Sequence, residues 1–251
     1  MLVSTNQGTT FTTVPLPFKN GSNDNGRNTG ERIAVDPNKP SIVYFGTRLA
    51  GLQISTNSGA SWTQATGLPV TSTSNGNGAI AVLPIQASGT SGSPTPAVYA
   101  AVAGTGVSGT PVGLYVTTAG GSATSTFTAV TGQPTFASAT TPLAPLHAVL
   151  GPNGAIYVLY GDQTGPGSMN VSELWEFQPA PGVWTSGSWT QITLPNGNLA
   201  INNSNGYGGL AVDPSNAGAS SWSAPSTNTG PQAMRSTDPT TTEPPGAISP
   251  R

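Results

Sequence analysis

Side chains that can do acid–base, nucleophilic or metal chemistry are scarce in this chain, and the densest group lies between residues 23 and 32. That stretch reads Asn-Asp-Asn-Gly-Arg-Asn-Thr-Gly-Glu-Arg and leads directly into an apolar run. Its charged side chains Arg27, Glu31 and Arg32 are candidates for binding a ligand, because they lie in the connection that enters a strand. A network of ion pairs and caps that only fixes the loop explains the cluster equally well.

Asp162 is a second candidate ligand-binding residue. Tyr157, Tyr160 and the polar loop 163–170 surround it in the sequence, which makes a polar and aromatic group. Tryptophan faces can also stack on sugars, although tryptophans in sheets more often pack against other side chains. Three tryptophans follow this group: Trp175, Trp184 and Trp189.

Several common chemistries are excluded by composition. The chain has no cysteine, so disulfides, thiolate metal sites and thiol catalysis are ruled out. His147 is the only histidine, and one histidine cannot build a multi-histidine metal site. Residues 104–109 match the pattern GxGxxG, but Thr-Pro and another strand follow where a dinucleotide site needs a helix. We therefore expect no metal and no cofactor.

The low charge of the chain restricts its partners. Charged residues make up 6% of the sequence and the formal net charge is −2. A surface with so few cations cannot neutralise a phosphate backbone, so we expect no nucleic-acid binding, and anionic membranes are disfavoured for the same reason. The start of the chain has no signal-peptide pattern and no apolar run is long enough to span a bilayer. A neutral ligand fits this composition best.

Two similar octets indicate how the chain is built. Ser-Thr-Asn-Gln-Gly-Thr-Thr-Phe at 4–11 recurs as Ser-Thr-Asn-Ser-Gly-Ala-Ser-Trp at 55–62. Each follows an apolar run, so each is predicted to be the turn of a β-hairpin, in which Asn bonds backbone two residues on and Gly adopts a positive φ. The aromatic residue at the eighth place is expected to fold back onto the next sheet. The predicted turn residues are Asn6, Gly8, Asn57, Gly59 and Trp62.

A second repeated motif is Ala-Val-Asp-Pro, which contains Asp36 and recurs with Asp213. Because the same four residues end an apolar run in both places, a turn role is favoured over a catalytic one: Asp caps its own turn and Pro presets φ.

The repeats predict an all-β chain made of four-stranded units. A period of about fifty residues is typical of propeller blades. The predicted strands lie at 32–37, 41–47, 51–56 and 61–66; at 79–84, 97–103, 112–118 and 125–130; and at 146–150, 155–160, 173–177 and 188–193. Residues 1–18 are predicted to be the outer part of a preceding blade, and 209–214 the inner strand of a following one. The fold class is thus an incomplete β-propeller, an open arc of about three blades.

The C-terminal segment differs in kind. We expect residues 1–216 to form the partial propeller and 217–251 to be a disordered tail, because the tail is dense in Ser, Thr and Pro and lacks strand alternation. A shifted reading frame is an equally good explanation, since shifted codons for 219–234 would restore hydrophobic residues.

The octet at 4–11 and the segments 16–19, 26–37, 44–48 and 205–214 closely resemble glycoside hydrolase family 74, the xyloglucanases. In that family the octets are Asp-box (BNR-repeat) turns, here with Asn at the usual Asp place. Asp boxes also occur in sialidases and sortilin-type propellers, whereas the Gly-Glu-Arg segment at 30–32 is more specific. The resemblance covers residues 1 to about 216 and is strongest over 1–70.

The resemblance implies two facing seven-bladed propellers with a sugar-binding cleft between them, and secretion from the cell. It implies hydrolysis of the β-1,4-glucan backbone of xyloglucan with inversion, by one Asp from each propeller. Neither Asp position falls within this chain, so no catalytic residue is assigned.

The chain is therefore interpreted as a partial segment of the N-terminal propeller of an inverting xyloglucan hydrolase. It is expected to be inactive alone, with a neutral polysaccharide and the missing blades of the same parent as its partners. The alternative is a non-catalytic propeller segment that binds carbohydrate or protein; a sialidase is a distant third, because Arg27, Arg32 and Arg48 crowd into one unit instead of converging from several blades.

Overall fold

The computed structural model describes residues 1–19, 32–47, 50–69, 78–103, 112–122, 125–134, 143–162, 171–193, 209–213, 220–223 and 234–235, the last two ranges and 78–80 by their backbone alone. Within these residues the regular elements are β-strands and one 3₁₀ turn, η1 (Gln86–Ser88). None of the helical structure in the described part is long and apolar enough to cross a membrane.

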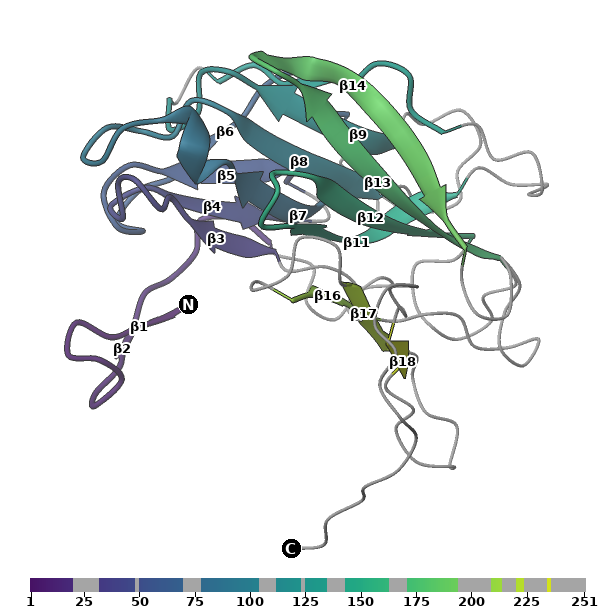
Figure 1. Ribbon diagram of the computed structural model, residues 1–251. Helices are drawn as coiled ribbons and strands as arrows, with labels where there is room; N and C mark the ends of the chain where they lie inside the picture. Colours follow the sequence, from purple (N-terminus) through teal and green to yellow (C-terminus); the bar gives the residue numbers. More distant parts are fainter. Residues whose placement is uncertain are drawn as a thin grey trace, which may run out of the picture.

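Three four-stranded antiparallel sheets make up most of the molecule (Figure 1). Strands adjacent in the chain are adjacent in each sheet, so every sheet is a simple up-and-down meander, here called a blade. Blade 1 contains β3 (Ile33–Val35), β4 (Val43–Gly46), β5 (Leu52–Ser55) and β6 (Thr63–Gln64). Blade 2 contains β7 (Gly78–Pro84), β8 (Val98–Ala103), β9 (Gly113–Thr117) and β10 (Thr128–Ala129). Blade 3 contains β11 (Ala144–Leu150), β12 (Ile156–Gly161), β13 (Ser172–Ala180) and β14 (Val183–Ile192).

Blade 3 has the largest difference from the predicted strands. Of its two outer strands, β13 ends at Ala180 and β14 begins at Val183. The sequence predicts an end at 177 and a beginning at 188. Gly182 has φ +71°, which closes a tight turn between them and lets the ladder continue to the tip.

Smaller sheets flank the blades. β1 (Leu2–Val3) pairs with β2 (Thr12–Thr13) before blade 1, and β16 (Gly209–Val212) pairs with β17 (Ser220–Ser223), which pairs with β18 (Met234–Arg235), after blade 3. β17 and β18 fall in the segment for which a disordered tail is expected. Residues 214–219, 224–233 and 236–251 lie outside the described residues, so that expectation stays a prediction.

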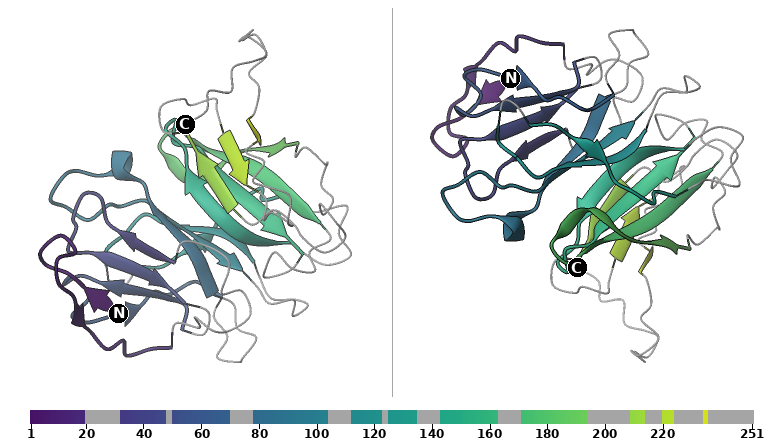
Figure 2. Two further views of the ribbon diagram at one scale, coloured as in Figure 1. Left: turned by 90° about the horizontal axis from the view of Figure 1, so that it is seen from below. Right: turned by 90° about the horizontal axis from the view of Figure 1, so that it is seen from above.

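The blades fan out side by side around their first strands (Figure 2). β3 contacts β7, β7 contacts β11 and β11 contacts β16, so the inner strands follow one another in chain order. This radial order confirms the predicted all-β fold with three consecutive propeller-like blades.

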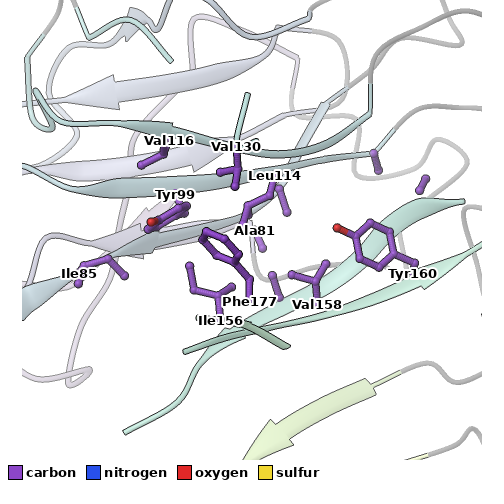
Figure 3. Packing of buried hydrophobic residues seen from close by; sticks show 14 of the residues in the cluster. Ala81, Ile85, Tyr99, Leu114, Val116, Val130, Ile156, Val158, Tyr160 and Phe177 are labelled. Atoms are coloured by element: carbon purple, nitrogen blue, oxygen red, sulfur yellow. The ribbon is translucent and has the colours of Figure 1, made fainter. Parts of the chain in front are cut away.

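Two apolar clusters hold the blades together. Between blades 1 and 2, Tyr44 and Ile54 pack with Val98, Ala100 and other residues of β8 and β9. Between blades 2 and 3, the alternate residues of β8 meet blade 3, as Figure 3 shows for Tyr99 near Ile156 and Phe177. β8 is therefore buried on both faces, which explains why its sequence is a continuous apolar run without alternation.

The antiparallel ladders give each blade two distinct ends. β3, β7, β11 and β16 all begin at one end, which carries Arg32 just before β3; we call it the Arg32 end. They finish at the opposite end, where Asp36 follows β3; we call it the Asp36 end. Each polar residue of interest can be assigned to one of these two ends.

Candidate functional site

Both octets form hairpin turns, one between β1 and β2 and the other between β5 and β6, and the second lies at the Asp36 end. In the second, the Ser55 hydroxyl accepts from the backbone N–H of Asn57 (3.3 Å) and of Gly59 (2.8 Å). Asn57 Oδ1 accepts from the N–H of Ser61 at 2.8 Å. The first octet repeats this network at equivalent positions.

The asparagine contacts differ from the predicted ones. Asn57 bonds the backbone four residues on, and Ser55 makes the bond two residues on. The reason is that two consecutive residues, Ser58 (φ 58°) and Gly59 (φ 88°), are left-handed, which curls the turn so that the Asn carboxamide spans it. A positive φ at the residue before the glycine carries no signal in the sequence.

The two eighth-place aromatic residues behave differently. Trp62 packs edge-on against Phe18 and Phe45 and donates its indole N–H to the Gly59 carbonyl at 3.0 Å. Phe11 is 60% exposed. Blade 1 offers Trp62 a complete sheet, whereas the two-stranded β1–β2 sheet offers Phe11 little apolar surface to cover it.

Asp36 lies in a buried, hydrogen-bonded polar cluster at the Asp36 end. The side chain is 0% exposed. Its Oδ1 accepts from the N–H of Asn38 (2.9 Å) and of Lys39 (3.1 Å), which closes its own turn. Across the blade boundary, the Thr95 hydroxyl donates to Oδ1 at 2.6 Å and the Thr95 N–H donates to Oδ2 at 2.8 Å.

A second tier of contacts surrounds this carboxylate. The Tyr44 hydroxyl lies 3.5 Å from Oδ2, and burial, together with the charge of Asp36, raises the pKa of Tyr44 above its usual range. Asn38 Nδ2 donates to the Gln86 carbonyl and to the Thr95 hydroxyl, each at 3.0 Å. Asp36 thus does more than cap a turn: it joins blade 1 to the connection between β7 and β8 of blade 2.

Asp213 directly follows β16, as Asp36 directly follows β3. In contrast to Asp36, its side chain is exposed.

The Arg32 end holds the predicted ligand-binding residues that are described. Arg32 and Asp162 are both half-buried there, Arg32 before β3 of blade 1 and Asp162 after β12 of blade 3. Blade 2 lies between blades 1 and 3, so the two residues lie at one end of the molecule but on different blades. Arg27 and Glu31 lie outside the described residues.

A carboxylate that sequence reasoning missed is close to Asp162. Glu173 is the second residue of β13, is 3% exposed, and accepts a 2.8 Å hydrogen bond from the indole N–H of Trp175. The available signal was alternation, because Glu173, Trp175 and Phe177 fall on one face of β13.

The aromatic neighbours of Asp162 are part of the core. Tyr157 and Tyr160 are buried, and burial raises the pKa of Tyr160 far above its usual range. His147 is buried on β11. The three tryptophans pack against the cluster between blades 2 and 3, as the structural interpretation predicts: Trp175, Trp184 and Trp189.

The described residues contain no group of three or more His, Cys, Asp or Glu side chains that could hold a metal ion. What the Arg32 end offers a ligand is a guanidinium on blade 1 and a carboxylate on blade 3. Such groups suit hydrogen bonding to the hydroxyls of a neutral, extended ligand.

Comparison with known proteins gives a consistent result. No protein-family model matches the chain. A xyloglucanase of Paenibacillus sp. is 37% identical over 224 residues, which is 85% of this chain and 20% of that protein. The crystal structure of a xyloglucanase of glycoside hydrolase family 74 from Xanthomonas campestris aligns with a TM-score of 0.69 and 32% identity, over 94% of this chain and 32% of that one. The family 74 enzyme of Niastella koreensis aligns with a TM-score of 0.69 and 39% identity, over 88% of this chain and 29% of that one.

The chain therefore spans between a fifth and a third of the length of these relatives. Its blades correspond to one part of a much longer protein.

Proposed function

This chain belongs, as a partial segment, to glycoside hydrolase family 74, and we propose that it forms one wall of the sugar-binding cleft of an inverting xyloglucan hydrolase. The observation that carries the proposal is the match of 85% of the chain to only 20% of a xyloglucanase. A segment of that size contributes blades and binding groups, while the rest of the enzyme contributes the remainder of the cleft.

We propose that the segment alone does not hydrolyse xyloglucan. Inversion needs one carboxylic acid to protonate the leaving oxygen and one carboxylate to activate water on the opposite side of the sugar. Both have to be held at the same glycosidic bond, and loss of either partner removes several powers of ten in rate. We assign neither role to Glu31, Asp162 or Glu173.

We propose that the Arg32 end faces the polysaccharide. Arg32 and Asp162 lie at this end on different blades, so an extended glucan chain can contact both as it crosses blade 2. Arg27 and Glu31 precede Arg32 directly in the sequence and are assigned to the same surface. The ligand is neutral, in keeping with the 6% content of charged residues.

The parent enzyme is proposed to act outside the cell, where polymeric xyloglucan is found, and its other blades complete the ring. Leu2, Phe11, Ile33 and Val35, in or next to the first two sheets, are exposed apolar side chains, as expected where a preceding blade packs.

The test is to measure binding and hydrolysis separately on the purified 251-residue chain. Titration calorimetry with xyloglucan oligosaccharides is expected to show weak binding that Asp162→Asn reduces at least about threefold, since one charge-assisted hydrogen bond is lost. Glu176→Gln, which removes the same charge from the middle of β13, is the matched control and is expected to bind as the parent does.

Reducing-end release from xyloglucan is expected to stay at the level of a buffer blank. Turnover above that level, abolished by Glu31→Gln or Asp162→Asn, would show that the chain carries its own catalytic pair. Binding that is equal in all variants would place the ligand surface elsewhere.

A further inference from the structure

The joint between blades 1 and 2 depends on a motif that occurs twice in the chain. At the first copy, the buried carboxylate of Asp36 receives the hydroxyl and the backbone N–H of Thr95 from blade 2, at 2.6 and 2.8 Å. Its remaining acceptor positions are filled from its own turn. The next blade therefore supplies the donors that allow this carboxylate to be fully buried.

The second copy occupies the same place relative to its flanking strands. Val35 and Val212 both end an inner strand and precede the Asp-Pro pair. Val35 pairs with Val43 and Val212 pairs with Ser220, so connections of equal length follow the two strands. β16 also continues the row of inner strands, because it packs beside β11 as β11 packs beside β7.

Blades 2 and 3 lack this feature. At the place of the aspartate, β7 ends in Leu83-Pro84 and β11 is followed by Gly151-Pro152. The aspartate is therefore not needed to make the bend after an inner strand. Its presence marks a particular kind of joint with the blade that follows.

The two aspartates differ in what covers them. Asp36 is covered by the connection between β7 and β8, which bonds it through Thr95 and bonds Asn38 through the Gln86 carbonyl. Gly92 N–H also donates to the Asn38 carbonyl at 2.7 Å, so the connection is fastened over the turn at several points. Asp213 is exposed.

We propose that Asp213 is the docking point for a further blade, whose first inter-strand connection supplies a serine or threonine hydroxyl and a backbone N–H to the carboxylate. This inference rests on the proposed function, since it takes the segment to be completed by further blades. It adds the residue that makes the joint and the chemistry of its partner.

The test compares two backgrounds. One is the 251-residue chain, and the other is the intact Niastella koreensis relative with its matching segment replaced by residues 1–216 of this chain. Asp36→Asn is expected to lower the thermal midpoint in both backgrounds. Asp213→Asn is expected to leave the chain alone unchanged but to lower the midpoint of the chimaera by at least about 2 °C. Glu176→Gln is the matched charge control in both.

The partner is identified by a second substitution in the chimaera. The serine or threonine in the first connection of the following blade is changed to alanine, alone and together with Asp213→Asn. Coupled residues give a double variant whose shift is smaller than the summed single shifts.

The outcomes separate the two proposals. If the chimaera folds and hydrolyses xyloglucan but Asp213→Asn does not lower its thermal midpoint, the docking role is wrong and the proposed function stands. Equal loss of stability in both backgrounds also overturns it, because Asp213 then serves only its own turn. A chimaera with no cooperative unfolding transition overturns the proposed function, and the docking role with it.

Discussion

A carboxylate can leave water only where hydrogen-bond donors replace the water, and Asp36 shows how this is done at a single residue. Two backbone N–H groups of its own turn and two donors of Thr95 reach it. Charge-assisted bonds of this kind contribute about 1.5–3 kcal/mol each when one partner is removed. One residue therefore bonds both the turn after β3 and the connection of blade 2 that covers it.

Asp36→Asn keeps the shape of the side chain but points an NH₂ group at donors that need an acceptor. We expect the free energy of unfolding to fall by about 3 kcal/mol. Urea unfolding followed by tryptophan fluorescence measures it, with Glu176→Gln as a control that should change it by less than about 0.5 kcal/mol. A change as small in Asp36→Asn would show that the carboxylate is not needed.

Because tyrosine hydroxyls are buried, the free energy of unfolding is expected to depend on pH in the alkaline range. Burial raises the pKa of Tyr44, Tyr99, Tyr115 and Tyr160 above the ordinary value. A raised folded-state pKa gives stability that is complete below the unfolded value of about 10 and is lost as pH rises above it.

We therefore expect the free energy of unfolding to be level with respect to these groups up to about pH 9.5 and to fall steeply above pH 10. Tyrosinate absorbance is expected to appear together with unfolding. Tyr99→Phe, which loses the hydrogen bond from Tyr99 to the Trp184 carbonyl, should flatten the slope. Four tyrosines that titrate reversibly near pH 10 in the folded protein would contradict this.

At the scale of elements, the two octet hairpins are a natural pair of experiments. Ser55 is fully buried and satisfies the N–H of Gly59, whereas the equivalent network around Ser4 is exposed to water. An unsatisfied buried donor costs about 1–3 kcal/mol, and water can replace the lost partner at the exposed site.

Ser55→Ala is thus expected to lower the free energy of unfolding by about 2 kcal/mol, and Ser4→Ala by less than about 0.5 kcal/mol. Denaturant titration of both variants beside the parent protein checks the difference. Equal losses would mean that the turn network acts through its geometry and not through burial.

The strands were predictable because turn motifs in the sequence mark where they begin and end. Asp-Pro and Asn-x-Gly turns repeat at fixed places, and apolar runs lie between them, so all twelve strands of the three blades were placed near their true positions. The joint at Asp36 was not predictable, because Thr95 is 59 residues away and lies in a connection without a distinctive motif. Glu173 was missed because a carboxylate near the start of a strand looks like a solvent-facing residue.

The sequence predicts where the candidate binding residues lie in the fold, and their role in binding stays a prediction. Strand order alone puts Arg32 and Asp162 at one end of the blades, and the structure places both there. Strand order does not predict that Tyr157 and Tyr160, which lie near Asp162 in the sequence, are buried instead of facing a ligand.

At the scale of the whole molecule, the main contacts between the described strands of different blades join neighbouring blades, so the arc behaves as a one-dimensional stack. The outer edges are joined as well as the inner strands. Thr66 pairs with Thr126 across blades 1 and 2, and the N–H of Thr131 donates to the Thr185 carbonyl across blades 2 and 3. Neighbouring blades are therefore fastened at their inner strands, their outer edges and the Asp36 end.

The double burial of β8 has a consequence for the opening motions of the protein. Its amides bond to β7 and β9, and blades 1 and 3 cover its two faces, so these amides should exchange only through global unfolding. Deuterium uptake followed by mass spectrometry should find the slowest exchange in Val98–Ala103, with protection decreasing outward to Leu2–Val3 in one direction and Gly209–Val212 in the other. The sheets at the two ends of the chain would then open first, and β8 would be the last strand to lose its protection.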